Sequence, residues 1–389
     1  MYRIQTFNNI AVSGLNRFPR DVYEIASDMG DPDAILLRSH NLHDMQVGAR
    51  LKAVGRAGAG TNNVPVARLS DAGVAVFNAP GANANAVKEL VIGGMLLAVR
   101  NLCQAWQYVR ELEPGDDLHE RVEQGKKQFV GSELPGRTLG VVGLGAIGVQ
   151  VANAARALGM RVLGYDPTIT VQSAWKLAAD VEKAISVDDL LARSDFVTVH
   201  VPLNDQTRGL IGPSRIGLLR RGVTILNFAR AEIVDEAAMI EGLDAGRIRM
   251  YVCDFPTARI KNHPRVIALP HIGASTHEAE ENCAVMVADQ LRDFLEHGTV
   301  TNSVNFPEAV LPRGSGYRLI VVNRNVPNMV GQVSTDLANA GLNILDMLNK
   351  SRGELAYNLI DTDTAVPDAA LNTIRSIEGV LSARVLDPV

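Results

Sequence analysis

Three polar residues in the second half of the chain have the side chains that acid–base and hydride-transfer chemistry uses. Arg230, Asp254 and His271 each stand at the end of a short apolar run. An arginine can bind a carboxylate through two parallel hydrogen bonds, and a histidine can exchange a proton near neutral pH. Each also has a structural interpretation, because Arg230 and Asp254 could be surface ion-pair members and a single histidine is often structural. Their occurrence after successive apolar runs favours a common site.

A glycine-rich stretch upstream of these residues predicts a dinucleotide site. Gly143, Gly145 and Gly148 form G-x-G-x-x-G between an apolar run and a helical pattern, and Asp166 follows the next apolar run. The glycines permit a tight turn, a close approach of the pyrophosphate and close packing of the helix on the strand. Asp166 would accept hydrogen bonds from the adenosine ribose, which favours NAD over NADP. The alternative is a glycine-rich turn in another kind of α/β protein.

The elements that must position these residues are alternating strands and helices. Short apolar runs, separated by helical patterns, are typical of parallel strands with crossover helices in a doubly wound sheet. The predicted strands of this part are 138–145, 161–166, 196–202, 223–229, 250–255 and 266–271. Because ligands bind at the carboxyl ends of such strands, the sheet would gather the three polar residues at one edge.

The first 80 residues repeat the strand-and-helix pattern, with apolar runs at 34–39, 51–58 and 74–81. Residues 85–110 predict one long helix that is apolar nearly all round, which favours burial in the core or against a second subunit. Another amphipathic helix is predicted at 276–298.

The end of the chain predicts a separate small module. A segment rich in Pro, Gly, Asn and Ser is typical of a linker, and the order β-α-β-β-α-β follows it. The sequence therefore predicts a discontinuous substrate-binding domain, a nucleotide-binding domain inserted into it, a linker and a C-terminal module. The substrate-binding domain is predicted at 1–84 and 275–305, and the nucleotide-binding domain at 85–274. The linker is predicted at 306–316 and the C-terminal module at 317–389.

Composition excludes several classes of protein. The chain has 389 residues, 47% of them hydrophobic, and a formal net charge of −5 without blocks of like charge, so it does not resemble a nucleic-acid binder. No signal peptide or membrane-spanning stretch is expected. Three widely separated cysteines favour free thiols in a reducing cytosol over a disulfide framework or a metal site.

Several motifs along nearly the whole chain resemble the D-isomer-specific 2-hydroxyacid dehydrogenases. They are VGRAGAGTNNV (54–64), NAPGANANAVKEL (78–90), GRTLGVVGLGAIG (136–148), HVPLNDQTRGLIG (200–212), NFAR (227–230) and PHIGAS (270–275). The resemblance implies a Rossmann-type NAD-binding domain inserted in a flavodoxin-like substrate domain. It also implies that the ferredoxin-like C-terminal module is an ACT domain, a regulatory module found in some members.

The resemblance also implies an activity. It is the NAD-dependent oxidation of 3-phospho-D-glycerate to 3-phosphohydroxypyruvate, the first step of L-serine synthesis. Arg230 would clamp the substrate carboxylate, His271 would be the acid/base, and Asp254 would hold the nicotinamide carboxamide. The implied cofactor-binding residues are Gly143, Gly145, Ala146, Ile147, Gly148, Asp166, His200, Pro202, Thr207, Ala229, Asp254 and Gly273.

Other residues match positions for the substrate and an effector. The implied substrate-binding residues are Arg38, Ser39, Gly58, Ala59, Gly60 and Asn83, of which Arg38, Ser39 and Asn83 could also be ordinary surface-loop residues. Lys126 and Lys127 could reach a phosphate across a dimer, or could simply be solvated. In the C-terminal module, Asn323, Asn325 and Asn343 match the region that binds L-serine in serine-responsive members. The alternative is a module that dimerises without a ligand; a homodimer or homotetramer is expected.

One position departs from the family pattern. The family pairs its histidine with a glutamate a few residues after the aspartate, but Ala258 and Arg259 stand there, and no acidic residue occurs between Asp254 and Glu278. An inward-pointing arginine would disfavour a protonated histidine. Ala231 is a milder departure, because the family usually has glycine there. Two alternatives therefore stay open: a catalytically weak NAD(H)-binding sensor on the same fold, and a dehydrogenase for another D-2-hydroxy acid.

Overall fold

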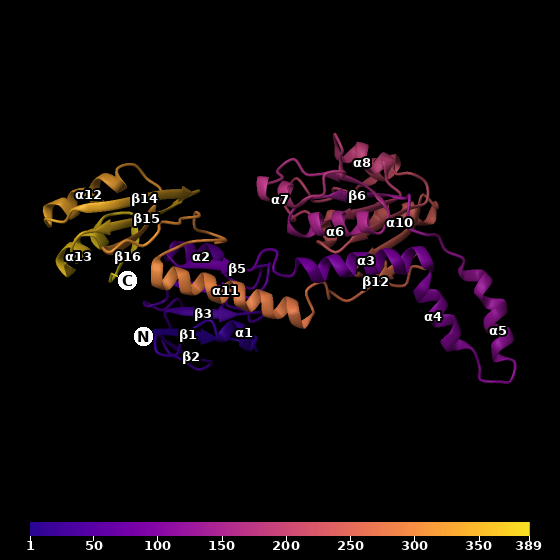
Figure 1. Ribbon diagram of the computed structural model, residues 1–389, viewed down its shortest axis with the longest axis horizontal. Helices are drawn as coiled ribbons and strands as arrows, with labels where there is room; N and C mark the ends of the chain where they lie inside the picture. The colour runs from indigo at the N-terminus through magenta and orange to yellow at the C-terminus, as the bar shows by residue number, and fades with distance from the viewer. Residues whose placement is uncertain (389) are drawn as a thin grey trace. The chain divides into compact units, whose positions relative to one another are not determined.

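The computed structural model describes residues 1–388 and has two compact units (Figure 1). One unit consists of Met1–Asn83 and His277–Val389, and the other of Ala84–Thr276. Both contain parallel sheets covered by helices, and a small antiparallel sheet ends the chain. The predicted α/β fold class is therefore confirmed.

The unit Ala84–Thr276 is built on a seven-stranded parallel sheet. Its strand order is β12-β11-β10-β9-β6-β7-β8, so the order reverses at β6, the switch point where doubly wound sheets bind ligands. The strands are β6 (Thr138–Val142), β7 (Arg161–Tyr165), β8 (Glu182–Lys183), β9 (Phe196–Val199), β10 (Val223–Asn227), β11 (Ile248–Cys253) and β12 (Val266–Ala268). All six predicted strands are present, and the two-residue β8 was not predicted.

Short helices connect these strands. They are α6 (Ala146–Ala157), α7 (Val171–Lys176), α8 (Val187–Arg193), α9 (Pro213–Leu218) and α10 (Glu236–Asp244), with a 3-10 turn, η2, at Ala231–Ile233. The central strands β6, β9 and β10 are buried along their whole length, which explains why they read as continuous apolar runs.

The single long helix predicted at 85–110 is wrong. The structure has α3 (Ala84–Arg100) and α4 (Leu102–Glu111), separated by Asn101 in the left-handed region at φ 53°. Asparagine tolerates this conformation, and its side-chain amide donates to the carbonyl of Val130 over 3.3 Å. Residues on one face of α3 are buried, whereas α4 has no buried residue. Two further elements follow, α5 (Leu118–Gly125) and the 3-10 helix η1 (Lys126–Phe129).

The N-terminal part of the other unit is a five-stranded parallel sheet. Its order is β2-β1-β3-β4-β5, the arrangement of flavodoxin-like sheets. The strands are β1 (Tyr2–Thr6), β2 (Tyr23–Ala26), β3 (Ala34–Leu37), β4 (Ala53–Arg56) and β5 (Ala75–Asn78), and the helices are α1 (Val12–Leu15), α2 (Val66–Asp71) and α11 (His277–His297). The helix α11 returns from the far end of the chain and packs its apolar face on this sheet, with Val287 and Leu291 fully buried (Figure 1).

The C-terminal module has the predicted order β-α-β-β-α-β. It comprises β13 (Tyr317–Arg324), α12 (Met329–Asn339), β14 (Ile344–Arg352), β15 (Leu355–Thr362), α13 (Asp368–Ser376) and β16 (Val380–Leu386). Its antiparallel sheet has the order β14-β15-β13-β16, with both helices on one face. This is the ferredoxin-like arrangement.

A buried arginine ties this module to the segment before it. Arg318 has no exposed side-chain surface and makes a bidentate ion pair with Asp361, at 2.6 and 2.7 Å. Its remaining donors reach the carbonyls of His297, Leu311 and Pro312. Phe306 is also buried, so the segment predicted as a linker is packed chain rather than a free spacer.

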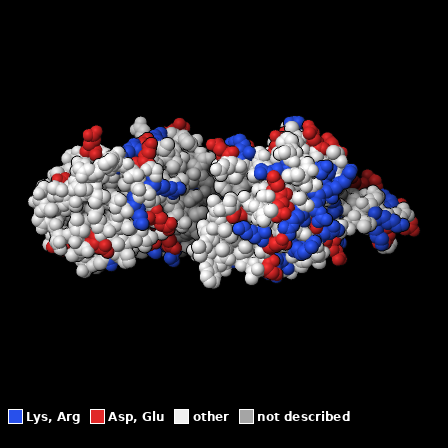
Figure 2. All heavy atoms as spheres, turned by 90° about the horizontal axis from the view of Figure 1, so that it is seen from above, with Lys and Arg blue, Asp and Glu red and all other residues white. Residues whose placement is uncertain are grey.

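The surface mixes charges of both signs, as the face in Figure 2 shows. Within residues 1–388, no helix combines the length and apolarity that a membrane span requires. The cysteines Cys103, Cys253 and Cys283 are free, as predicted.

Candidate active site

Three adjacent parallel strands end beside one another in the Rossmann unit. β10 pairs with β11 and β11 pairs with β12, and Arg230, Asp254 and His271 follow their respective carboxyl ends. The sheet therefore brings the three residues to one edge, as the sequence predicted. Since the carboxyl ends of doubly wound strands are where ligands bind, this edge is the candidate active site.

Asn227 fixes the backbone that carries Arg230. Its side chain is fully buried, accepts from the Ala229 N–H at 3.1 Å and donates to the Arg230 carbonyl at 2.9 Å. The arginine itself is exposed, and one guanidinium nitrogen donates to the Ala229 carbonyl at 2.6 Å. Its planar fork carries further donors, and so can bind a carboxylate.

Asp254 is a buried carboxylate whose oxygens accept no hydrogen bond of good geometry from the described protein. The residue is 1% exposed, and neither carboxylate oxygen has a partner within residues 1–388. Burial raises the pKa of Asp254 to about 6; the main-chain N–H groups of Asp254 and Gly273 and the charge of Arg230 oppose this rise. A buried polar group left unpaired is unfavourable, so the site fits a ligand that donates a hydrogen bond, such as a nicotinamide carboxamide.

His271 is exposed and packs against Phe255, with ring centroids 4.5 Å apart. The nearby position where the family has a glutamate carries Arg259, which is 64% exposed and lies 3.5 Å from Glu236. Thr257 also donates to Glu236. The arginine thus turns toward a carboxylate of α10, in an exposed and therefore weak ion pair.

The glycine loop after β6 has the geometry of a phosphate cradle. Gly143 has φ 92°, and a Cβ at Gly148 would lie 1.9 Å from the Gly143 carbonyl oxygen, so neither tolerates a side chain. At Gly145 no atom lies within 4 Å of the added Cβ, which leaves open space at the first turn of α6. Asp166 accepts from the N–H groups of Leu144 and Thr168, at 2.9 and 2.8 Å. These residues fit NAD, whose pyrophosphate binds helix N-termini of this kind.

The remaining cofactor residues surround the same strand ends. Ala146 and Ile147 begin α6. His200 follows β9, bonds Thr198 at 2.9 Å, and burial lowers its pKa to about 4. The Thr207 hydroxyl donates to the Pro202 carbonyl at 2.5 Å.

The predicted substrate loop lies in the other unit, after β4. The Ala79 N–H donates to the Gly58 carbonyl at 3.0 Å, and the Asn78 amide donates to the Ala59 carbonyl at 2.6 Å, which fixes the loop through Gly60. A Cβ at Gly58 would lie 1.9 Å from Nη1 of Arg56. Sequence reasoning missed Arg56, although its place two residues before the glycine loop was a usable signal.

Arg38 stands close to this loop but already has a carboxylate partner. Its guanidinium lies 2.7 Å from Glu280, and its carbonyl accepts from Nε of Arg56 at 3.1 Å. The Ser39 N–H donates to the side chain of Asn8 at 3.0 Å. Two arginines and one glutamate therefore leave net positive charge at the carboxyl ends of β3 and β4.

The other predicted substrate residues lie elsewhere. Asn83 is the half-buried residue in the turn before α3. Lys126 pairs with Glu123, and both Lys126 and Lys127 belong to η1.

Comparison with known proteins identifies the family. Residues 92–273 match the D-isomer specific 2-hydroxyacid dehydrogenase, NAD binding domain. The chain is 32% identical over 366 residues to D-3-phosphoglycerate dehydrogenase of Escherichia coli K12, covering 90% of this chain and 85% of the relative. This chain belongs to the D-isomer-specific 2-hydroxyacid dehydrogenase family. NAD is accordingly the cofactor of the Rossmann unit.

The chain spans only about half to two thirds of the length of two other curated relatives. The D-3-phosphoglycerate dehydrogenase of Methanocaldococcus jannaschii is 35% identical over 350 residues, which are 87% of this chain but 63% of the relative. The D-3-phosphoglycerate dehydrogenase of Archaeoglobus fulgidus is 36% identical to this chain, and the matched part is 53% of that relative's length. A crystal structure of NAD⁺-bound 3-phosphoglycerate dehydrogenase from Entamoeba histolytica has a TM-score of 0.61 and 27% identity, covering 78% of this chain and 98% of that one.

In this chain, the three asparagines of the C-terminal module have different surroundings. Asn323 is buried, and its amide bonds the Arg324 carbonyl and the side chain of Asn358. Asn325 and Asn343 are exposed at loops, where Asn325 donates to the Gly353 carbonyl at 3.1 Å. The structure thus does not gather the three asparagine side chains into one described contact network, and their role in effector binding stays a prediction.

Proposed function

We propose that this protein oxidises 3-phospho-D-glycerate to 3-phosphohydroxypyruvate with NAD, as the entry step of L-serine synthesis. The observation that carries the proposal is the placement of Arg230, Asp254 and His271 at the ends of three adjacent strands beside a dinucleotide loop. The names of the relatives in Escherichia coli and Methanocaldococcus jannaschii support the substrate.

Each residue has a task that its surroundings support. The Arg230 fork would bind the 2-carboxylate of the substrate, in competition with its weaker bond to the Ala229 carbonyl. His271, exposed at the strand end, would take the 2-hydroxyl proton and return it in the reverse direction. Asp254 would accept from the carboxamide and so orient the nicotinamide ring. When bound, NAD accepts the hydride from C2.

The phosphate end of the substrate needs positive charge, which the loop after β4 supplies. Arg38 and Arg56 lie around Gly58 and are partly offset by Glu280. A phosphate can displace the carboxylate of Glu280 from Arg38, because Arg38 and Glu280 are both solvent-accessible and exposed ion pairs are weak. A member that used an unphosphorylated, lactate-sized 2-hydroxy acid would not need this cluster.

A second candidate is a catalytically weak NAD(H)-binding sensor on the same fold. The missing glutamate favours it, because Ala258 and Arg259 stand at its place. Arg259 adds nothing to this argument, because it turns toward Glu236. General acid–base catalysis contributes about 10²–10⁴-fold to the rate. A histidine whose protonated form lacks the family's glutamate would therefore give a slower enzyme.

The test is the initial rate of NADH oxidation with 3-phosphohydroxypyruvate between about pH 5 and 9, which spans the ordinary histidine pKa. A measurable rate that Arg230→Gln and His271→Asn both abolish, while NADH still binds, supports the dehydrogenase. Arg193→Gln, which changes an exposed arginine of the same unit, is the matched control. Tight NADH binding without any rate would select the sensor.

We further propose that the C-terminal module is an ACT domain through which L-serine lowers activity. Asn325 and Asn343 are exposed and can reach a ligand. Millimolar L-serine that changes neither rate nor melting temperature would contradict this proposal.

We expect at least a dimer, because α4 and its neighbourhood expose apolar side chains, among them Leu102, Trp106 and Val109 at 45%, 63% and 50%. Analytical ultracentrifugation at micromolar concentration checks this, and a stable monomer would count against it. A cytosolic location stays a prediction.

A further inference from the structure

A cavity of about 490 Å³ lies where the C-terminal module meets the flavodoxin-like sheet, within one unit. Its walls come from the loop before β4, the turn between α2 and β5, the helices α11 and α13, and the strands β13 and β16. Its volume is in the range of small-molecule sites, which hold about 300–1,000 Å³. It lies before the amino ends of β4 and β5, whereas the predicted substrate loop follows the carboxyl end of β4.

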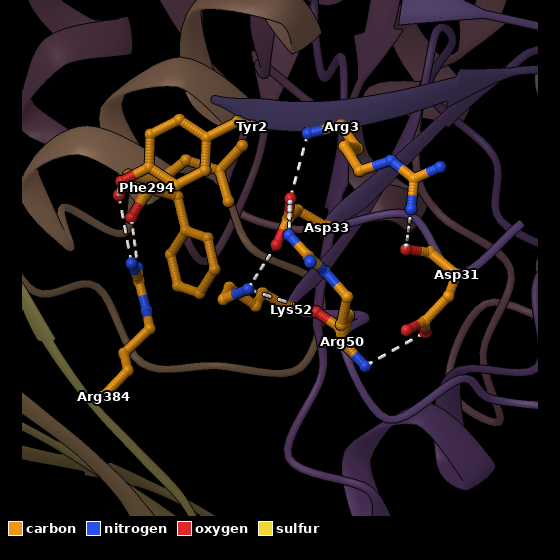
Figure 3. A network of polar contacts seen from close by, with 9 residues as sticks. Tyr2, Arg3, Asp31, Asp33, Arg50, Lys52, Phe294 and Arg384 are labelled. Carbon is orange, nitrogen blue, oxygen red and sulfur yellow. Dashed lines mark hydrogen bonds and ion pairs between the residues drawn. The ribbon is translucent and has the colours of Figure 1, made fainter. Parts of the chain in front are cut away.

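The charged side chains that line this cavity are all basic. They are Arg50, Lys52, Arg375 and Arg384, with no Asp or Glu among the lining residues. One buried carboxylate behind the wall, Asp33, offsets part of this charge (Figure 3). It accepts from Lys52 at 2.5 Å and from Arg50 at 3.0 Å. Four positive charges and one negative charge leave an excess of three.

The two arginines from the C-terminal module have no ion-pair partner within residues 1–388. Arg384 donates to the carbonyls of Phe294 and Leu295, at 2.5 and 3.0 Å (Figure 3). Arg375 donates to the Ala383 carbonyl through two nitrogens, at 3.0 and 2.8 Å. Carbonyl oxygens orient the guanidinium groups without neutralising them, and burial lowers the pKa of Arg384. An anion in the cavity would supply the missing charge.

The remaining wall is apolar. Val74, Ile320 and Val322 are buried residues that border the cavity, together with the ring of Phe294, over which Arg384 lies at 5.0 Å. A ligand that matched both walls would carry negative charge at one end and an apolar group at the other.

We propose that this cavity is a binding site for a small organic dianion, a phosphate monoester or a dicarboxylate. Its charged group would bind Arg375 and Arg384, with Arg50 and Lys52 completing the positive field. Its apolar part would lie against Phe294. Because residues of both the sheet and the module line the site, the ligand would bridge them and stabilise their contact.

The experiment is calorimetric titration of the full chain with phenyl phosphate. All proteins carry Arg230→Gln, so that an anion cannot bind the candidate active site through that arginine. Arg375→Gln is the decisive variant, because this arginine is exposed and its loss should not unfold the module; Arg384→Gln is the second. Arg20→Gln, an exposed arginine of the same unit outside the cavity, is the matched control.

We expect phenyl phosphate to bind, and each cavity variant to weaken binding by about 10–100-fold, the value of one charge-assisted hydrogen bond. The control should bind like the parent. Inorganic phosphate should bind more weakly, because it lacks the apolar part, and benzyl alcohol should not bind. If phthalate binds as well as phenyl phosphate does, the site accepts dianions in general. If phenyl phosphate binds and phthalate does not, the site is specific for phosphate monoesters.

Two results would overturn the proposal. One is the absence of binding by both phenyl phosphate and phthalate up to roughly 10 mM, where even weak sites of this kind give measurable heat. The other is binding that Arg375→Gln and Arg384→Gln leave unchanged. Because these titrations involve no turnover, they remain informative if the proposed dehydrogenase activity fails.

Discussion

Replacing Asp254 by asparagine should stabilise the folded protein at neutral pH while weakening its binding of NADH. Asp254 is almost completely buried, and its two oxygens have no hydrogen-bond partner within residues 1–388. An asparagine has the same shape but no charge, so it removes the unfavourable burial of an ion. It also keeps only one acceptor oxygen and no charge, so it should hold the N–H group of a cofactor carboxamide less tightly.

The magnitude follows from the pKa. Burial raises the pKa of Asp254 from its ordinary value of 3.8 to about 6. A difference of about two pKa units corresponds to about 3 kcal/mol at pH values above both, at about 1.4 kcal/mol per unit. Because burying the asparagine amide also loses hydration, we expect a net gain of about 1–3 kcal/mol in the free energy of unfolding.

The gain should depend on pH with a defined sign. Between pH 3.8 and about 6 the folded protein holds the Asp254 proton more tightly than the unfolded chain. The unsubstituted protein therefore loses stability as pH rises through this window, whereas the variant does not. The gain in the free energy of unfolding of the variant over the unsubstituted protein should reach its full value at about pH 7. At about pH 4 this gain should be less than a third of the full value.

Thermal unfolding of both proteins across this pH range measures the difference. The pKa of His200, which burial lowers to about 4, adds a pH dependence of the opposite sign, but both proteins share it and it cancels. Asp195→Asn is the matched control: this aspartate has partners in the Thr138 N–H and Arg220, so its loss should destabilise. Fluorescence titration measures NADH affinity. A variant less stable at every pH, or a gain that did not change with pH, would refute the reasoning.

Four further substitutions test the sites. Gly148→Ala should abolish NADH binding, because the added Cβ would lie 1.9 Å from the Gly143 carbonyl oxygen; unchanged NADH affinity in a fluorescence titration would contradict this. Ala258→Glu should shift the pH–rate profile of ketone reduction to higher pH by supplying a carboxylate near His271, the proposed acid/base; an unshifted profile would count against that role. Arg38→Gln should raise KM for 3-phosphohydroxypyruvate about tenfold or more with a smaller change in kcat, whereas Glu280→Gln, which frees the arginine, should lower KM.

The sequence by itself determined the fold class and the cofactor site. The central strands of the Rossmann sheet are buried on both faces, so each appears as a continuous apolar run, and a phosphate loop needs glycines at fixed spacing. Arg230, Asp254 and His271 could be located because each directly follows such a strand. These features are local, and local features are visible in a linear sequence.

Contacts between distant segments were decided only by the tertiary structure. The helix predicted at 85–110 breaks at Asn101, because its amide reaches the carbonyl of Val130. Arg259 pairs with Glu236, a carboxylate that counting forward from Asp254 could not find. The basic cavity likewise combines side chains some 300 residues apart, such as Lys52 and Arg384. Such contacts leave no periodic pattern in the sequence. They arise from the way in which whole helices and strands pack together, and the spacing of residues along the chain does not predict them.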